Sequence, residues 1–339
     1  MRLSRRDSLL GIAGVLGLAW IGFRRRQAGS FYQGKVVVVT GGSRGLGLAM
    51  ARCLAERGAD LALLARDPDE LGRAKADLAR FGRTVSTWPC DLTSEDQIAA
   101  TIRDAFNFHG RLDVLINNAG EIVVGPALPL KTQEFDQLMN LHFWAAFHTV
   151  AHVLPLFRKQ GGGSIINIAS IGGKVALPHM LSYTASKFAL VGFSEGLQAE
   201  VAPENIRVTT VCPWVIRTGS NLNAKFKGKA DKEFAWFTAG MQTPLTSVSA
   251  KRLARRVIDA GALGQPVLIF PWQASLTVAM HGVFPNLVAY ASGLVKRVLP
   301  TPNDDPSIQE PVPGKSVQKS PGGNGHLRPS DQAARDLNE

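Results

Sequence analysis

The sequence predicts a single doubly wound α/β domain, in which helices cover both faces of a parallel β-sheet. Short runs of β-branched and apolar residues alternate along the chain with segments of helical periodicity. The runs are apolar on both faces, which is typical of strands buried between two layers of helices. With 339 residues, of which 45% are apolar and 19% charged, the chain has enough apolar material for one large core, and this composition excludes wholesale disorder.

Six strands are expected, separated by longer stretches in which apolar residues recur at helical spacing. That spacing is clearest at residues 46–57 and 69–80. The alternation is the pattern of a Rossmann-type fold, which we expect to occupy residues 31–270. The expected strands are residues 36–40, 60–65, 114–117, 165–169, 208–212 and 267–270.

Residues 1–30 are expected to be a membrane anchor or a signal segment. Arginines at 5–6 and 24–26 flank an uncharged stretch at 9–23. As a helix this stretch is about 22 Å long, shorter than the roughly 30 Å hydrocarbon core of a bilayer. The arginine pair favours a twin-arginine export signal, the second cluster favours an anchor that is retained, and a helix outside the membrane is a third interpretation.

Two further segments follow the expected domain. Residues 271–300 are rich in Leu, Val, Phe and Trp, and we expect an apolar helical extension that lies in a membrane interface, forms a dimer contact or packs on the core. Residues 301–339 hold six prolines and almost no large apolar side chains. Such a segment is expected to be a disordered tail.

Charge and cysteine content exclude several classes of protein. The formal charge is +11, but no dense Lys/Arg run with interleaved aromatic residues is present, so no nucleic-acid partner is expected. Cys53, Cys90 and Cys212 form no C-x-x-C pair, and neither a metal site nor a disulfide framework is expected. A reducing, cytosolic environment fits these cysteines, and an anionic cofactor or membrane surface fits the positive charge.

A glycine-rich turn joins the first expected strand to a helix. Residues 40–47 read TGGSRGLG. Gly41 and Gly45 allow the backbone to turn tightly and to approach a pyrophosphate, and Gly47 allows the helix to pack on the sheet. Between a buried strand and a helix, this turn predicts nucleotide binding.

The choice between the two nicotinamide dinucleotides depends on the end of the second strand. A carboxylate there suits the free ribose 2′-hydroxyl of NAD(H), whereas a guanidinium suits the 2′-phosphate of NADP(H). Arg66 occupies this place and Arg44 can supply a second guanidinium, so NADP(H) is favoured. The alternative is that Arg66 is solvated and Asp67 accepts the ribose hydroxyl.

Three polar residues carry the expected chemistry. Tyr183 and Lys187 are four residues apart, so they project from the same face of a helix. An ammonium group beside a phenol lowers the phenol pKa from about 10 toward neutrality, which prepares it for proton transfer. Ser170 closes a buried strand, where its hydroxyl can donate to a substrate carbonyl oxygen.

Taken in order, these motifs resemble the short-chain dehydrogenase/reductase family of the T-G-x-x-x-G-x-G type. The similarity covers residues 31–270. A further match at residues 213–218 has Trp214 where the family usually has glycine. The motifs are TGGSRGLG at 40–47, CDLT at 90–93, NNAG at 117–120, MNL at 139–141, NIAS at 167–170 and YTASK at 183–187.

The resemblance implies roles for individual residues. It implies a catalytic tetrad of Asn140, Ser170, Tyr183 and Lys187, in which Asn140 helps to hold a water that links the lysine to solvent. It places Asp91 against the adenine ring, a position that is also compatible with a helix N-cap cluster. The cofactor-binding residues it implies are Gly41, Ser43, Arg44, Gly45, Leu46, Gly47, Arg66, Asp91, Asn118, Tyr183, Lys187, Pro213 and Thr218.

We therefore expect an NADP(H)-dependent oxidoreductase that moves hydride between nicotinamide and a carbonyl or secondary alcohol, and the resemblance favours ketone reduction. Aromatic residues and lysines at 219–250 predict a cover over an apolar or lipid-like substrate, or simple packing over the cofactor. A non-catalytic NADP-binding scaffold and a sugar epimerase are alternatives. We expect a homo-oligomer that associates with a membrane and keeps its catalytic domain in the cytoplasm, or else is exported.

Overall fold

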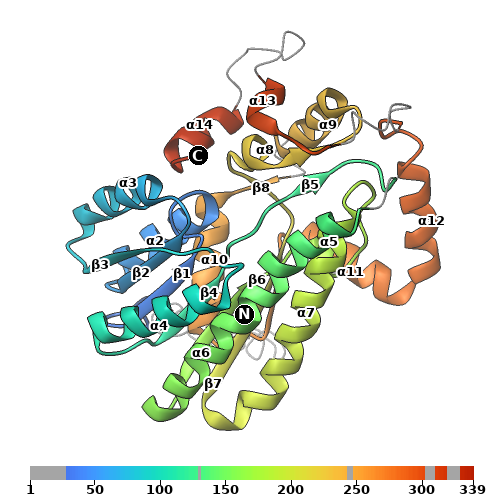
Figure 1. Ribbon diagram of the computed structural model, residues 1–339. Coiled ribbons are helices and arrows are strands. Elements are labelled where there is room, and N and C mark those ends of the chain that lie inside the picture. Colours follow the sequence, from blue (N-terminus) through green and yellow to red (C-terminus); the bar gives the residue numbers. More distant parts are fainter. Residues whose placement is uncertain (1–27, 129–130, 243–246, 302–309, 319–328) are drawn as a thin grey trace, which may run out of the picture.

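The computed structural model describes residues 28–128, 131–242, 247–301, 310–318 and 329–339 (Figure 1). The predicted segment at residues 1–30 lies almost entirely outside these described residues. At the centre of the fold is a seven-stranded sheet in the order β11-β7-β6-β4-β1-β2-β3. Its strands are β1 (Val36–Thr40), β2 (Asp60–Ala65), β3 (Val85–Pro89), β4 (Val114–Asn117), β6 (Gly163–Ile168), β7 (Ile206–Pro213) and β11 (Val267–Phe270).

Every neighbouring pair in this sheet is parallel, so the prediction of a doubly wound parallel sheet in one domain is confirmed. After β3 the chain crosses to the other side of β1 to form β4, which reverses the strand order at β1. In open α/β sheets, ligands bind at such a reversal, outside the carboxyl ends of the strands. The fold therefore places a crevice beside the end of β1.

Two layers of helices cover the sheet, as Figure 1 shows. Successive strand residues point to opposite faces. In β1, Val37 and Val39 belong to the core shared with α2, α3 and α10, whereas Val36 and Val38 belong to the core shared with α4 and α6. The helices are α2 (Gly45–Glu56), α3 (Pro68–Leu78), α4 (Glu95–His109), α6 (Ala145–Gln160), α7 (Leu181–Val201) and α10 (Ala250–Ala262), with 3₁₀ turns at Ala79–Phe81, Ile171–Gly173 and Ala202–Glu204.

Smaller elements lie above the carboxyl ends of the strands. Helix α5 (Thr132–Met139) continues through a π-helical turn, Asn140–Trp144, into α6. Two short sheets, in the strand orders β10-β8 and β12-β9-β5, lie in this region together with two further helices. These elements are β5 (Val123–Val124), β8 (Val215–Arg217), α8 (Ser220–Asn223), β9 (Lys225–Phe226), α9 (Ala230–Gln242), β10 (Ser247–Ser249) and β12 (Val312–Pro313).

The prediction of a disordered tail at residues 301–339 is wrong for the two parts of it that the structure describes. The first forms β12, which pairs with β9, and α13 (Gly314–Gln318). The second contains α14 (Pro329–Asp336), which lies above α2 and α3 in Figure 1. The few apolar side chains in these parts, Val317, Ala334 and Leu337, are buried against the domain. Docking to a surface that is already folded thus replaces the core that these segments cannot form alone.

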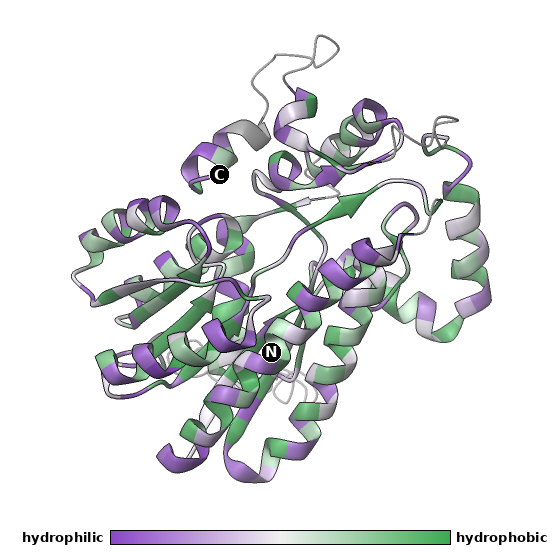
Figure 2. Ribbon diagram, viewed as in Figure 1, coloured by the Kyte–Doolittle hydropathy of each residue, from purple (hydrophilic) through white to green (hydrophobic). Residues whose placement is uncertain are grey.

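Helices α11 (Trp272–Val283) and α12 (Pro285–Val295) lie in the segment for which the sequence predicts an apolar helical extension. They project at the side of the domain, and green apolar bands recur along both in Figure 2. Among the helices that the structure describes, no single one is long and apolar enough to cross a bilayer, whereas α11 and α12 together meet that criterion as a pair bent by 118°.

Candidate active site

Three of the four predicted catalytic residues, Ser170, Tyr183 and Lys187, meet at a cavity of about 490 Å³ outside the carboxyl ends of the strands. Ser170 follows β6, and Tyr183 and Lys187 lie on α7, so two different elements bring these side chains to one place. Of the sequence-predicted site residues, those that line the cavity are Gly41, Ser43, Arg44, Gly45, Leu46, Arg66, Asn118, Ser170, Tyr183, Lys187, Pro213 and Thr218.

The glycine-rich turn has the backbone that a phosphate cradle needs. Gly41 and Gly45 have φ values of +62° and +57°, which glycine adopts without strain. A Cβ at Gly47 would overlap the carbonyl oxygen of Gly41, so a side chain there would displace the turn. The amide group of Asn118 donates to the carbonyls of Thr40 and Gly41, at 3.1 Å in each case, and fixes the turn against β4. The first N–H groups of α2, which have no partner within the helix, lie at this turn, and such groups fit a dinucleotide pyrophosphate.

The residues at the adenosine end carry both signs of charge. Arg44 donates to Glu70 at 2.9 Å, and the Ser43 hydroxyl donates to the same carboxylate at 3.0 Å. Arg66 is exposed at the cavity rim. The Asp67 carboxylate caps α3 by accepting two backbone N–H bonds, which lower its pKa. Asp67 thus caps α3 through Oδ1 alone, and Arg44, Arg66 and Asp67 all line the cavity at this end.

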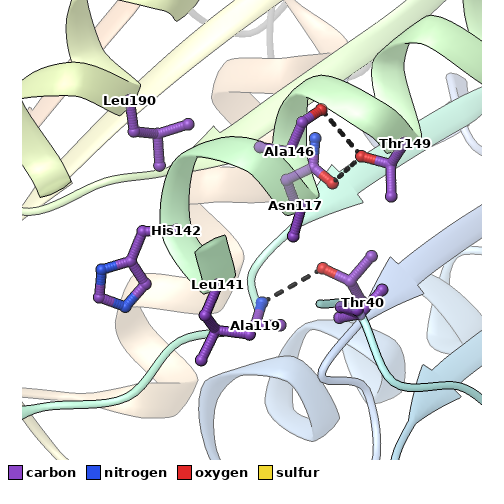
Figure 3. Close-up of a pocket in the computed structure, with 10 residues that line it drawn as sticks. Thr40, Asn117, Ala119, Leu141, His142, Ala146, Thr149 and Leu190 are labelled. Carbon is purple, nitrogen blue, oxygen red and sulfur yellow. Dashed lines mark hydrogen bonds between the residues drawn. The ribbon is translucent and has the colours of Figure 1, made fainter. Parts of the chain in front are cut away.

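Strand-end residues build the cavity floor. The Thr40 hydroxyl oxygen accepts from the backbone N–H groups of Asn118 and Ala119, at 2.9 and 3.2 Å. Figure 3 shows the second of these bonds beside a small adjoining pocket that Asn117 and His142 also line. These contacts join β1 to β4 at the point where the strand order reverses.

Tyr183 is buried beside Ser170. Burial raises the pKa of Tyr183, and the hydrogen bond from Ser170 opposes that rise. The expectation that Lys187 lowers this pKa is not what the protein alone displays, because the lysine Nζ lies 5.8 Å from the centre of the phenol ring and burial dominates. In the protein alone, the phenol is therefore poised as a proton donor.

Lys187 is buried, and burial lowers the pKa of its amine to about 8. Its Nζ donates to the carbonyl oxygen of Ile168 at 3.0 Å. An ammonium group has three donors, and this bond uses one of them. Lys187 thus lies in the cavity wall, the pKa of its amine is close to neutral pH, and hydrogen-bond donors remain for a cofactor or water.

Asn140 does not line the cavity with the other three residues, and its implied place in the tetrad stays a prediction. Asn140 is exposed on the outer face of the π-helical turn and is not part of the cavity lining. His142, two residues later, is 2% exposed and packs edge-on against the Tyr183 ring at 5.5 Å. At about 100° per residue, two positions turn a side chain to nearly the opposite face of a helix, which explains the difference.

The hydrogen bonds of His142 fix its protonation state. Nε2 accepts from the backbone N–H of Glu121 at 3.1 Å, so this nitrogen carries no proton. The Ser186 hydroxyl donates to the Tyr183 carbonyl oxygen, so it accepts from His142 Nδ1 at 2.8 Å. Burial and the nearby charge of Lys187 hold the pKa of His142 well below its usual range. His142 is therefore a neutral imidazole that ties the Tyr183 helix to the strand-end loop.

Asp91 and Trp214 take different positions around the site. The Asp91 carboxylate accepts from the backbone and hydroxyl of Thr93, and Asp91 lies outside the cavity lining, where its neighbours Cys90 and Leu92 take part instead. These contacts are those of a helix N-cap cluster, the alternative interpretation of Asp91. Trp214 is half-buried and lines the cavity, and its backbone N–H donates to Phe270 at 2.9 Å. The hydrogen bond to β11 thus holds the backbone of this loop, and the loop has its path without a glycine at position 214.

A buried ion pair and a buried hydrogen bond fix the segments that cover the cavity. Lys227 donates to Glu134 at 2.8 Å, and His179 contacts Glu233 on α9 at the same distance. Phe226 is fully buried among the aromatic residues of α9. Among the described residues, no group of three or more His, Cys, Asp or Glu side chains could hold a metal ion.

Comparison with known sequences agrees with this geometry. The profile of the short chain dehydrogenase family matches residues 35–227. The chain is 36% identical over 234 residues to an Anopheles gambiae protein named dehydrogenase/reductase SDR family protein 7-like, covering 66% of this chain and 73% of that protein. The Drosophila melanogaster protein of the same name is 30% identical, with 79% and 82% covered.

Solved structures share the fold. L-sorbose reductase from Gluconobacter frateurii, complexed with NADPH and L-sorbose, superposes with a TM-score of 0.64 at 28% identity, covering 70% of this chain and 95% of that chain. An NAD⁺-bound xylitol dehydrogenase gives a TM-score of 0.62 at 26% identity, with 70% and 98% covered. The glycine turn, the Ser170, Tyr183 and Lys187 group, the parallel sheet and the matching family profile lead to one conclusion: the chain belongs to the short-chain dehydrogenase/reductase family.

Proposed function

We propose that the protein is an NADP(H)-dependent reductase of ketones with apolar, lipid-like substituents. The observation that carries the proposal is the convergence of Ser170, Tyr183 and Lys187 on one cavity that continues to the glycine-rich turn. NADPH, when bound, supplies the hydride. The chain's own residues then have to bind the dinucleotide, hold the carbonyl and deliver a proton.

Each of the three side chains has a separate task. The Ser170 hydroxyl donates to the substrate oxygen and stabilises the negative charge that develops there. Tyr183 delivers the proton from its phenol oxygen, for which the hydrogen bond with Ser170 and the enclosed setting orient it. Lys187 has donors free beyond its bond to Ile168, and these bind the ribose and return a proton toward the phenol.

Loss of the phenol oxygen tests this assignment. In Tyr183→Phe we expect NADPH consumption with a ketone panel to fall by about 10²- to 10⁴-fold, the usual contribution of a positioned acid. NADPH affinity, followed by fluorescence, should change little. A variant that retained full turnover would overturn the proposal and favour a non-catalytic scaffold.

The preference for NADP(H) is supported by two guanidinium groups, those of Arg44 and Arg66, which line the cavity near the end of β2. A guanidinium recognises phosphate through paired hydrogen bonds. We expect Arg66→Asp to lose most of the preference for NADPH over NADH, measured as the ratio of the two dissociation constants. Arg103→Asp, on the exposed face of α4, is the matched control. Equal affinities for both dinucleotides in the unaltered protein would contradict the assignment.

The substrate class follows from the part of the cavity beyond Tyr183. This part is lined mainly by apolar side chains, namely Ile122, Leu177, Met180, Val215, Phe237 and Met241. Each methylene group buried there contributes about 0.8 kcal/mol, or roughly fourfold in kcat/KM. We expect kcat/KM to rise along a series of methyl ketones of increasing chain length. A higher kcat/KM for keto-sugars than for this series would refute the apolar assignment.

We also propose that the protein associates with a membrane, with the catalytic domain on the cytoplasmic side. Large apolar side chains are exposed along α11 and α12, and Leu287, Tyr290 and Leu294 are 58%, 77% and 58% exposed. Lys296 and Arg297 follow at the end of α12 and suit anionic headgroups. The buried, unpaired cysteines fit a reducing compartment.

Flotation of the full chain with phosphatidylcholine–phosphatidylglycerol vesicles tests this membrane association. We expect the combined Leu287→Glu and Leu294→Glu variant to lose most of its vesicle binding. Leu128→Glu, at an equally exposed leucine elsewhere on the domain, should keep it. Unchanged vesicle binding in the double variant, or a change only in oligomeric state, would assign this face to another role.

A further inference from the structure

Residues 334–339 lie across the glycine-rich turn. The backbone N–H of Gly45, at the start of α2, donates to the Leu337 carbonyl oxygen at 2.9 Å. Asn338 donates from its side chain to the carbonyl of Ser43 at 2.8 Å and to that of Glu70 at 3.1 Å. Arg73 in turn donates to the Asn338 side-chain oxygen at 2.7 Å. The segment is thus bound by backbone and side-chain groups of the turn itself.

Glu339 extends from this contact into the cavity. Its carboxylate accepts a hydrogen bond from Asn223 at 3.2 Å. A methyl group added at Gly45 or at Gly219 would overlap its oxygens, so the carboxylate fills the space between the glycine turn and the loop after β8. The charged side chains that act on it are Arg44, Lys315 and Glu70.

This is the place where an anion is expected on general grounds. The first N–H groups of a helix have no partner within the helix, and together with the helix dipole they favour negative charge. Here the Leu337 carbonyl takes the Gly45 donor, and the Glu339 carboxylate lies beside it. A phosphate group in the same place would meet both a steric overlap and a like charge.

Few apolar groups hold the segment. Ala334 and Leu337 are its buried apolar residues, and the remaining contacts are hydrogen bonds at the cavity mouth. Hydrogen bonds of this kind exchange readily with bonds to water or to a ligand, so their net contribution is small. Such a segment can leave the turn without disturbing the parallel sheet below it.

We propose that residues 329–339 are an internal competitor of the dinucleotide, which occupies the phosphate-binding turn and must leave before the cofactor binds. This regulation rests on the proposed function, because it needs a dinucleotide at the same site. A binding-competent state that is only fractionally populated lowers the apparent affinity by that fraction. If the segment is docked nine-tenths of the time, releasing it tightens the apparent dissociation constant for NADPH by about tenfold.

Two variants of the full chain test the competition. Leu337→Asp removes the apolar anchor, and Asn338→Ala removes the hydrogen bonds to the turn, while neither changes a residue of the catalytic group. Arg335→Ala, on the exposed side of α14, is the matched control. Titration of NADPH by fluorescence should give dissociation constants about tenfold lower for the first two variants, the tightening expected from releasing the segment, and unchanged for the control.

Hydrogen exchange supplies a second, direct measurement. We expect amides 337–339 of the unaltered protein to lose protection when NADPH is saturating. Unchanged protection together with equal NADPH affinity in all variants would overturn the competition while leaving the proposed function standing. If neither NADPH nor NADH binds even to Leu337→Asp, both proposals fall, because the turn then has no dinucleotide to exclude.

Discussion

Replacing Lys187 by methionine should stabilise the folded protein at pH 7 while removing its activity. The amine is buried, and its pKa is lowered from 10.5 to about 8. Each unit of lowering corresponds to about 1.4 kcal/mol, so the buried ammonium destabilises the fold by about 3 kcal/mol at pH 7. Loss of the hydrogen bond to Ile168 costs about 1 kcal/mol. A net gain of about 2 kcal/mol in the free energy of unfolding remains for Lys187→Met.

The expected gain in the free energy of unfolding for Lys187→Met depends on pH. The unfolded lysine keeps its proton up to about pH 10.5, whereas the folded one releases it from about pH 8. Stability of the unaltered protein therefore rises between these values, and the advantage of the methionine variant falls to about zero by pH 10. Urea unfolding of both proteins at pH 7 and pH 10 measures this. A variant less stable at pH 7, or a difference that does not change with pH, would refute the reasoning.

The other predictions concern the turn, the imidazole and the competing segment. Gly47→Ala should lower the free energy of unfolding by about 1–3 kcal/mol, as overpacking does, and weaken NADPH binding, whereas Gly72→Ala, with open space around it, should be neutral or slightly stabilising. His142→Leu leaves the Glu121 N–H without its acceptor and should cost about 2 kcal/mol in urea unfolding; an unchanged midpoint would contradict this. Burial raises the pKa of Glu339 to about 7, so docking is strongest at low pH and weakens as the pH rises through 7; NADPH affinity should then rise from pH 5 to 8 relative to Glu339→Gln, and parallel pH profiles would contradict it.

The sheet could be predicted from the sequence because its strands are apolar on both faces. Strand β3 was not among the expected strands, because it lies at the sheet edge and its sequence, VSTWP, contains no continuous apolar run. Ser170, Tyr183 and Lys187 were predicted from spacing and from their places at a strand end and on a helix, and the structure brings them to one cavity. Residue spacing and position within a strand or helix are therefore enough to predict a site residue when that single element determines where its side chain lies.

The missed residue in the candidate site had a signal of its own. Leu138, Ala145, Ala146 and Thr149 are buried at helical spacing, and His142 falls on that same face. Asn140 falls outside it. The apolar periodicity around the π-helical turn, followed strictly, would have added His142 to the predicted site residues.

Composition could not predict the docking of residues 329–339, because the partner of this segment is a surface that only the folded domain creates. That surface is formed by the start of α2 and by Arg44, which are the same features that suit it to a dinucleotide. Substitutions on the turn would therefore change the binding of both occupants together. Substitutions within the segment, such as Asn338→Ala, change one occupant alone, and for this reason they separate competition from cofactor recognition.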